Sequence, residues 1–108
     1  MKKGEVWFVE IPTSQGHEQY GLRPVIIFSQ PEANVVAIIP FTTNIKYNSL
    51  RHSLLIKPSL TNGLREDSIA LIFQIRVIDR EKFKRKIGTI ENATIEKINK
   101  ALKEFLEL

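Results

Sequence analysis

The chain has 108 residues and a mass of 12.4 kDa, a length typical of one domain, and we predict a single domain over residues 1–108. Its 43% hydrophobic residues allow a modest core, and its 26% charged residues argue against global disorder. It contains no cysteine, which excludes disulfides, thiol catalysis and thiolate metal sites. No apolar run reaches the ~18–20 residues of a membrane span, and Glu5 disfavours a signal peptide, so we expect a cytoplasmic protein without a membrane partner.

The charge balance favours an anionic partner without deciding the matter. Sixteen lysines and arginines stand against 12 aspartates and glutamates, which gives a formal net charge of +4. A basic small domain fits a nucleic-acid partner, because cationic side chains that contact phosphates release bound counterions. Many basic domains bind nothing anionic, so the charge has to be combined with the motifs described below.

The first two thirds of the chain are predicted to form short strands separated by irregular loops. The run Val25–Phe28 is continuously apolar, which is typical of a strand buried on both faces. Gln74 and Arg76 interrupt the longest β-prone run, and their spacing of two puts them on one face of an extended chain. Short strands of this kind predict a small, strongly bent barrel or sandwich. The expected strands are Glu5–Ile11, Pro24–Ser29, Asn34–Ile39, His52–Lys57, Ser68–Ile78 and Lys86–Ile90.

The C-terminal segment changes to the period of a helix. Its apolar residues recur at spacings of three and four, so they form one stripe that we expect to pack on the sheet. Asn92 is the predicted N-cap. The residues of the stripe are Ile95, Ile98, Leu102, Phe105 and Leu106. The expected fold class is therefore mainly β with a C-terminal helix.

A polar loop before the second expected strand is the first candidate for chemistry. Pro24 disfavours helical geometry at Arg23, so this arginine should be extended at the mouth of the strand. The glycines of the loop let it fold back, which would bring Glu18 and Gln19 close to Arg23. A flexible hairpin loop with a solvated arginine explains the same residues equally well.

Two further segments place polar groups beside apolar strands. Thr42, Thr43 and Asn44 follow the third expected strand, where their side chains could bind phosphate oxygens or simply cap the turn. Gln74 and Arg76 could line a binding groove or the wet face of a sheet edge. The basic run Arg80–Lys86 could follow a phosphate backbone, but we interpret it as a solvated turn.

Metal and nucleotide cofactors find no support in the sequence. His17 and His52 have no carboxylate or second histidine at a metal-ligand spacing, and no HExxH, P-loop or GxGxxG motif is present. We therefore expect neither a metal site nor a cofactor.

Four segments in the same order give the chain a resemblance to a known family. It resembles the MazF/PemK toxin endoribonucleases in the segments Gly4–Trp7, Glu18–Pro24, Pro40–Thr43 and Gln74–Asp79, which are followed by the C-terminal helix. The resemblance covers nearly the whole chain. It implies a small SH3-like barrel of the MazF/CcdB-like plasmid toxin fold and a homodimer. It also implies metal-independent cleavage of single-stranded RNA at short sequence motifs, and a cognate antitoxin that occupies the RNA groove.

The resemblance also assigns roles to individual residues. Arg23 and Thr42 match the catalytic pair of the family, and Glu18 falls in the loop that contributes to its active site. We take Glu18 as the proton acceptor, with His17 as an alternative. The residues expected to bind RNA are Gln19, Thr43, Gln74 and Arg76.

Two positions depart from the family pattern, and two other functions remain open. His17 and Phe73 stand where the family commonly has a small polar and a polar or acidic residue, so the base preference cannot be carried over. The alternatives are a CcdB-like gyrase poison, which shares the barrel but lacks the Arg/Thr pair, and an SH3-like RNA-binding module without turnover.

Overall fold

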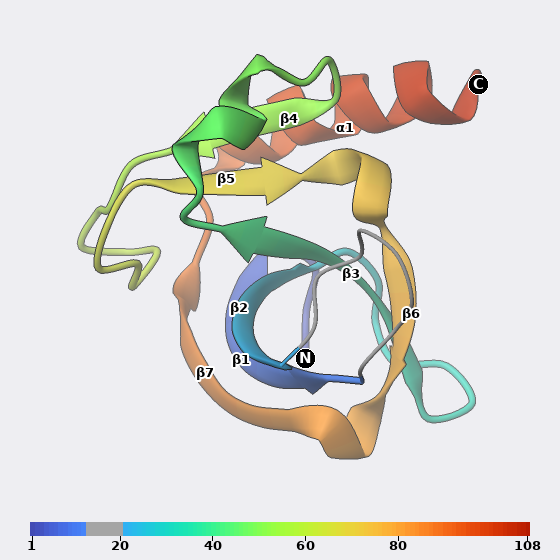
Figure 1. Ribbon diagram of the computed structural model, residues 1–108. Coiled ribbons are helices and arrows are strands. Elements are labelled where there is room, and N and C mark those ends of the chain that lie inside the picture. Colours follow the sequence, from blue (N-terminus) through green and yellow to red (C-terminus); the bar gives the residue numbers. More distant parts are fainter. Residues whose placement is uncertain (13–20) are drawn as a thin grey trace.

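The computed structural model describes residues 1–12 and 21–108, and in them seven antiparallel strands curve into a barrel beside one α-helix (Figure 1). The strands follow the order β4-β5-β3-β2-β1-β7, with β6 also paired to β3. The prediction of a mainly β fold with a C-terminal helix is confirmed. The elements are β1 (Glu5–Ile11), β2 (Gly21–Ile27), β3 (Val35–Thr42), η1 (Ile45–Ser49), β4 (Ser53–Ile56), β5 (Ser68–Leu71), η2 (Ile72–Gln74), β6 (Arg76–Asp79), η3 (Arg80–Lys82), β7 (Phe83–Thr89) and α1 (Asn92–Leu106).

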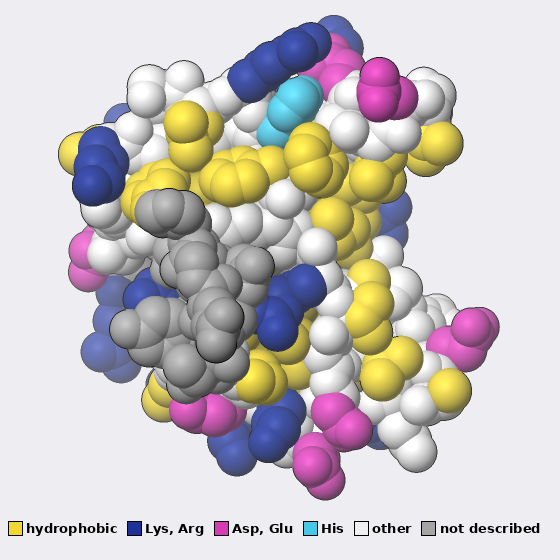
Figure 2. Space-filling model, turned by 45° about the vertical axis from the view of Figure 1, so that its right-hand side comes forward, with side chains coloured by type: hydrophobic (Ala, Val, Ile, Leu, Met, Phe, Trp, Pro, Cys, Tyr) yellow, Lys and Arg dark blue, Asp and Glu magenta, His cyan; other side chains and the backbone are white. Residues whose placement is uncertain are grey.

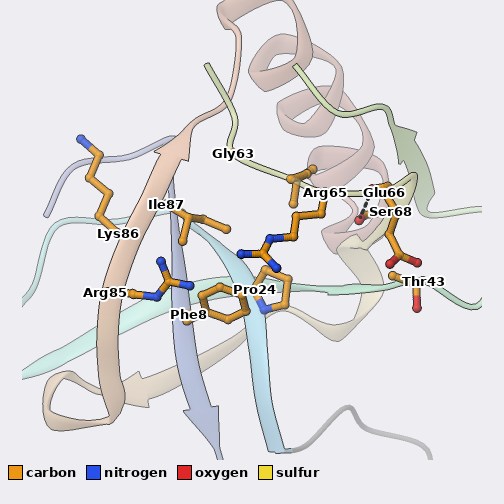
Figure 3. Close-up of a pocket in the computed structure, with 11 residues that line it drawn as sticks. Phe8, Pro24, Thr43, Gly63, Arg65, Glu66, Ser68, Arg85, Lys86 and Ile87 are labelled. Carbon is orange, nitrogen blue, oxygen red and sulfur yellow. Dashed lines mark hydrogen bonds between the residues drawn. The ribbon is translucent and has the colours of Figure 1, made fainter. Parts of the chain in front are cut away.

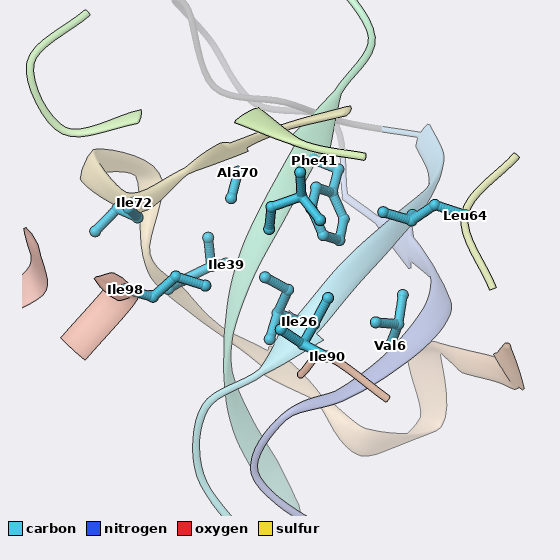
Figure 4. Packing of buried hydrophobic residues seen from close by; sticks show 10 residues of the cluster. Val6, Ile26, Ile39, Phe41, Leu64, Ala70, Ile72, Ile90 and Ile98 are labelled. Carbon is cyan, nitrogen blue, oxygen red and sulfur yellow. The ribbon is translucent and has the colours of Figure 1, made fainter. Parts of the chain in front are cut away.

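Strands β1, β2 and β3 each contribute side chains to two different cores, one on each face. The barrel core lies inside the strands and consists of Val9, Ile11, Val25, Ile27, Val36, Ile38 and Ile78. The helix-side core lies between the outer face of the same strands, the β4–β5 hairpin and α1 (Figure 4). Its buried members are Val6, Ile26, Ile39, Phe41, Ile56, Leu64, Ala70, Ile72, Ile90 and Ile98. The continuous apolar run of β2 is explained by this double burial, as predicted.

The expected strand Ser68–Ile78 is wrong as a single element. Phe41 pairs with Ala70 and Ile38 pairs with Arg76, so β3 advances by three residues while the facing chain advances by six. The surplus is taken up by η2, which bends the chain between β5 and β6. Gln74 therefore lies in a 3-10 turn and does not share the face of an extended strand with Arg76.

Three other expected boundaries shift in the structure. Strand β2 begins at Gly21 and ends at Ile27, so Arg23 lies within it rather than just before it. Strand β3 continues through Thr42, because Phe41 and Thr42 pair with β5 after the pairing with β6 has ended. The basic run predicted as a turn is η3 followed by the first half of β7.

Helix α1 covers the helix-side core with the predicted stripe. Ile98 is fully buried and Ile95 and Leu102 pack against the core, whereas Phe105 and Leu106 are 37% and 47% exposed beyond it. The N-cap is Glu91 and not Asn92. Within the described part of the chain, no helix is long and apolar enough to cross a lipid bilayer.

The Glu91 side chain links the start of α1 to a distant loop. One of its carboxylate oxygens accepts hydrogen bonds from the Ser59 hydroxyl at 2.6 Å and the Thr61 hydroxyl at 2.7 Å. These two hydrogen bonds lower the pKa of Glu91, because they stabilise the ionised form. These hydrogen bonds attach the loop after β4 to the start of α1 at the surface of the protein, outside the core.

The lowered pKa of Glu91 predicts a pH-dependent contribution to stability. A depressed folded-state pKa adds stability above the unfolded value near 4.5, and this is lost as the pH falls through the folded value. Glu91→Ala should lower the free energy of unfolding at pH 7 by up to about 1 kcal/mol, as expected of an exposed charge. Urea denaturation at pH 7 and pH 3 measures this, and the loss should shrink at pH 3. Glu96→Ala, which removes an exposed helix carboxylate, is the matched control; an equal loss for both variants at both pH values would contradict the prediction.

Candidate active site

Arg23 and Thr42 occupy the same end of two neighbouring strands. The β2–β3 register pairs Val25 with Pro40, and two residues beyond this pair each strand reaches Arg23 or Thr42. Because side chains alternate, both lie on the face that carries the barrel core, and Arg23 pairs with the core residue Val9 across to β1. The structure therefore brings together the two residues predicted as the catalytic pair.

Two prolines end the ladder between these strands. Pro24 and Pro40 have no backbone N–H, and the regular pairing of β2 with β3 stops at the Val25–Pro40 pair. Beyond this pair, β1 continues to hold β2 through Ile11 and Gly21, while β5 holds the end of β3. The backbones around Arg23 and Thr42 are thus fixed by outer neighbours, and no ladder closes the space between them.

Thr42 is more buried than the sequence indicated. Its relative exposure is 6%, and its hydroxyl oxygen accepts the backbone N–H of Asn44 at 3.2 Å. The sequence left open whether this side chain binds phosphate oxygens or caps the turn, and in the structure the hydroxyl closes the turn after β3. Its own proton can still be donated to a substrate oxygen, since the bond to Asn44 uses only a lone pair.

Arg76 borders the same face of the sheet from the other edge of β3. It pairs with Ile38, a barrel-core residue, and its side chain is half-buried. One terminal guanidinium nitrogen is buried without a hydrogen-bond partner among the described residues. The guanidinium group as a whole is only half-buried, so its remaining N–H donors are candidates for contact with an anionic ligand. Gln74, half-buried in η2, comes just before it.

Thr43 lies apart from the predicted catalytic pair. It is exposed, and it lines a pocket with Phe8 and Pro24 on the opposite side of the sheet, because it alternates with Thr42. This pocket was not foreseen from the sequence, since its walls come from β1, β2, β7 and the 63–68 segment. Only the basic run in β7 gave a signal for it.

The remaining predicted site residues lie outside the described part of the chain. Glu18 and Gln19, together with the alternative base His17, fall within residues 13–20. The described flanks of this segment, Ile11 and Gly21, pair with each other two residues from Arg23. In residues 1–12 and 21–108, no three His, Asp or Glu side chains are grouped so that they could hold a metal ion.

The comparison with known proteins decides the family. The profile of the family described as PemK-like, MazF-like toxin of type II toxin–antitoxin system matches residues 2–106. The chain belongs to this family. It is 31% identical to endoribonuclease MazF9 of Mycobacterium tuberculosis, over all of this chain and 98% of that protein. It is also 31% identical to endoribonuclease EndoA of Bacillus subtilis, over all of this chain and 96% of that protein.

Solved structures of PemK/MazF toxins share the fold. The crystal structure of MazF from Deinococcus radiodurans superposes with a TM-score of 0.84 at 18% identity, covering all of this chain and 97% of that one. A mycobacterial endoribonuclease in complex with its cognate antitoxin superposes with a TM-score of 0.76 at 22% identity, covering all of this chain and 96% of that one. These similarities confirm the expected toxin barrel.

The two tasks of the Thr42 hydroxyl can be separated by substitution. Thr42→Ser keeps the hydroxyl and its bond to Asn44, so both folding and RNA cleavage should stay within a few-fold of the wild type. Thr42→Val keeps the shape but removes the hydroxyl, so cleavage should fall by ~10²–10³, the scale of losing one oxyanion donor. It should also cost about 1 kcal/mol of stability, the typical value of one hydrogen bond. Single-turnover cleavage and thermal unfolding measure the two effects; a Val variant that cleaves normally would remove Thr42 from the catalytic pair.

Proposed function

We propose that this toxin is a sequence-specific, metal-independent endoribonuclease that cleaves single-stranded RNA, such as mRNA, in the cytoplasm. The observation that carries the proposal is the placement of Arg23 and Thr42 on one face, where β2 and β3 are no longer paired with each other, in a chain of the PemK/MazF family. Relatives that match it over their whole length are named endoribonucleases.

The proposed reaction uses the ribose of the substrate as the nucleophile. The 2′-hydroxyl attacks the adjacent phosphorus, the bond to the 5′-oxygen breaks, and the products are a 2′,3′-cyclic phosphate and a 5′-hydroxyl end. This reaction requires charge stabilisation at the phosphorane, a proton acceptor and a proton donor. We assign the first requirement to Arg23 and Thr42 and the second to Glu18.

Arg23 is suited to charge stabilisation. Its planar guanidinium can bind two phosphate oxygens at once, and its backbone is fixed in the extended conformation of β2. An arginine side chain keeps its proton at neutral pH, so Arg23 is not assigned the role of general base. Thr42 holds a non-bridging oxygen, and Glu18 takes the proton of the 2′-hydroxyl, with His17 as the alternative acceptor.

The rest of the predicted RNA contacts extend the site along the strands. Arg76 offers its half-buried guanidinium on the far edge of β3, four residues back from the Thr42 position. At about 3.3 Å per residue this is roughly 13 Å along the strand, so Arg76 serves a neighbouring nucleotide rather than the cleaved phosphate. Gln19, Thr43 and Gln74 complete the proposed set of RNA-binding residues.

An antitoxin is the second proposed partner. The family is defined by type II toxin–antitoxin systems, and similar folds are found in a mycobacterial endoribonuclease with its cognate antitoxin and in MazE–MazF of Deinococcus radiodurans. We propose that a cognate antitoxin inhibits this chain by occupying the RNA groove.

A homodimer is the third element of the proposal. Figure 2 shows a band of hydrophobic side chains across one face of the molecule, next to a histidine. Leu50, Arg51, His52 and Phe73 line a shallow hollow, and the ring of Phe105 lies edge-on to His52 with 5.4 Å between centroids. We call Leu50, His52, Phe73 and Phe105 the apolar patch. An open apolar surface beside a predicted RNA groove fits the pairing of two subunits that frame the groove between them.

Cleavage in the presence of a chelator tests the proposed activity. Wild-type protein should cut an unstructured RNA at specific sites in EDTA, and end-sequencing should show one recurring motif. Loss of cleavage in EDTA with recovery in Mg²⁺ would contradict the metal-independent mechanism. Intact RNA that shifts on a gel would instead support a binding module, and gyrase-dependent DNA breaks would support a gyrase poison.

Arg23 variants link this activity to the site. Arg23→Ala should slow single-turnover cleavage by ~10²–10³, while RNA affinity falls far less because other cations share the phosphate contacts. Arg23→Lys should recover only part of the rate, since a point charge cannot bind two oxygens in a fork. Circular dichroism checks folding; a folded Ala variant with the wild-type rate would show that Arg23 is not catalytic.

The dimer is tested by sedimentation. The wild type at micromolar concentration should have about twice the 12.4 kDa monomer mass. Phe105→Glu keeps a good helix former in α1 but adds a charge to the apolar patch, so it should shift the population to monomers. Leu60→Glu changes an equally apolar, fully exposed residue outside the patch and should remain dimeric. A wild-type monomer that still cuts RNA would contradict the homodimer.

A further inference from the structure

The pocket that contains Thr43 lies back to back with the candidate active site. Pro24 and Thr43 line it, and each is the chain neighbour of a catalytic residue, Arg23 or Thr42. Arg23 and Pro24 are neighbours in β2 and point to opposite faces of the sheet, and Thr43, the first residue after β3, lines the pocket on the side of Pro24. The pocket has a volume of about 430 Å³, within the range of about 300–1,000 Å³ typical of small-ligand sites.

Two arginines converge on an aromatic floor in this pocket. Figure 3 shows Arg65 and Arg85 reaching over Phe8 and Pro24 from opposite walls. The guanidinium carbon of Arg85 lies 4.9 Å from the centroid of the Phe8 ring, a cation–π contact that holds Arg85 in place. The result is a cationic rim above an apolar surface.

The charges of Arg65 and Arg85 are not neutralised within the described chain. Lys86, which also lines the pocket, forms an ion pair with Glu5 at 3.5 Å. No other ion pair joins two residues of the described ranges 1–12 and 21–108. Glu66 is the single acid of the lining, and Figure 3 shows it on the side of Thr43. The pocket therefore combines two available guanidinium groups with one carboxylate.

The segment that carries Arg65 and Glu66 is held in place by hydrogen bonds and close packing. The buried side chain of Asn62 donates to the Lys57 carbonyl at 2.9 Å and accepts from the backbone N–H of Leu64 at 3.0 Å. Gly63 has a φ of +70° and lies so close to the Ile87 carbonyl that a Cβ would collide with it. The walls are thus fixed before any ligand binds, which reduces the entropy cost of binding.

We propose that this pocket binds one nucleotide of the RNA beside the cleaved bond and reads its base through Glu66. This rests on the proposed ribonuclease function. The forked guanidinium groups of Arg65 and Arg85 bind the phosphate. The base lies against Phe8, and the Glu66 carboxylate accepts a hydrogen bond from an N–H group on the base edge, as the amino groups of adenine, cytosine and guanine offer.

The composition of the pocket favours a nucleotide over an acidic peptide of an antitoxin. Both would be attracted to Arg65 and Arg85, but a peptide carboxylate would be repelled by Glu66, whereas a base presents N–H donors to it. The RNA can also reach both sites. The exposed Thr43 directly follows Thr42, and about 3.8 Å separates successive Cα atoms, so a strand that rounds the end of β3 passes from one site to the other.

The first test measures binding without cleavage. The probe is a fluorescent RNA with a 2′-deoxy nucleotide at the mapped cut position, or an unstructured RNA pool if no cut is found. The double variant Arg65→Ala, Arg85→Ala should bind it at least ~10-fold more weakly, with a salt dependence reduced by about 0.7 for each lost phosphate contact. Lys97→Ala, Lys100→Ala removes the same charge from the exposed side of α1 and should change both quantities much less.

The second test reads specificity. Glu66→Gln can both donate and accept, so it should relax or change the base preference at one position of the cleavage motif and leave the other positions as they are. The measurement is end-sequencing of a randomised RNA library cut by wild type and variant, with Asp67→Gln as the control for loss of a neighbouring charge. All six residues altered in the two tests are exposed, and thermal unfolding confirms that the variants are folded.

The outcomes separate this inference from the proposed function. Wild-type cleavage with unchanged affinity in the double arginine variant and an unchanged motif in Glu66→Gln would overturn the pocket and leave the ribonuclease in place. RNA binding that depends on Arg65 and Arg85 without any cleavage would overturn the ribonuclease and keep the pocket. Loss of antitoxin binding with normal RNA binding would assign the pocket to the antitoxin and overturn the inference.

Discussion

Strand β3 is the element on which the rest of the structure depends. It pairs with β2 along one edge, and along the other edge it pairs first with β6 and then with β5. Its side chains enter both cores, with Val36 and Ile38 in the barrel and Ile39 and Phe41 under the helix. Because β3 is paired along both edges and packed on both faces, its position is fixed, and the position of its last residue, Thr42, is fixed with it.

This arrangement explains how a chain of 108 residues can carry two sites. The sheet is one strand thick, so successive residues of β2 and β3 serve opposite faces: Arg23 and Thr42 face the barrel end, and Pro24 and Thr43 face the pocket. The rigid ladders lie further along both strands, where Ile26 and Ile39 are paired and buried. Small domains bury a limited share of their surface. Because the two sites share the same strand ends, the remaining residues of β2 and β3 stay available for the core.

The fold could be predicted from the sequence where a local pattern determined it. The apolar runs gave most strands, and the spacing of Ile95, Ile98 and Leu102 gave the helix. The 3-10 turn η2 could not be predicted, because the surplus of three residues arises only when β5 and β6 pair with the same strand. The N-cap was misassigned because Asn92 has the stronger intrinsic preference, whereas Glu91 has hydroxyl partners about 30 residues away.

The features of the candidate site also divide into those that a local pattern predicts and those that depend on contacts between distant segments. Arg23 could be recognised because Pro24 follows it and the family motif surrounds it, and Thr42 because it follows an apolar strand. The burial of Thr42 depends on β5, which the sequence does not connect to it. The pocket was missed because Phe8, Arg65 and Arg85 are separated by 57 and 20 residues and no motif joins them. Glu18 and Gln19 remain predictions from the sequence.

The double burial of β2 also bears on how its alignment is maintained. Val25, Ile26 and Ile27 are apolar toward both cores, so a slip of one residue would still bury hydrophobic side chains on each side. Such a slip would exchange the faces of Arg23 and Pro24 and carry the guanidinium away from Thr42. Hydrophobic burial therefore does not fix the register of β2 against β3. Pro24 and Pro40 fix it, because a residue without an N–H fits only where the β2–β3 ladder ends. A single inserted or deleted residue in this strand is an inactivating change that the core itself would barely register.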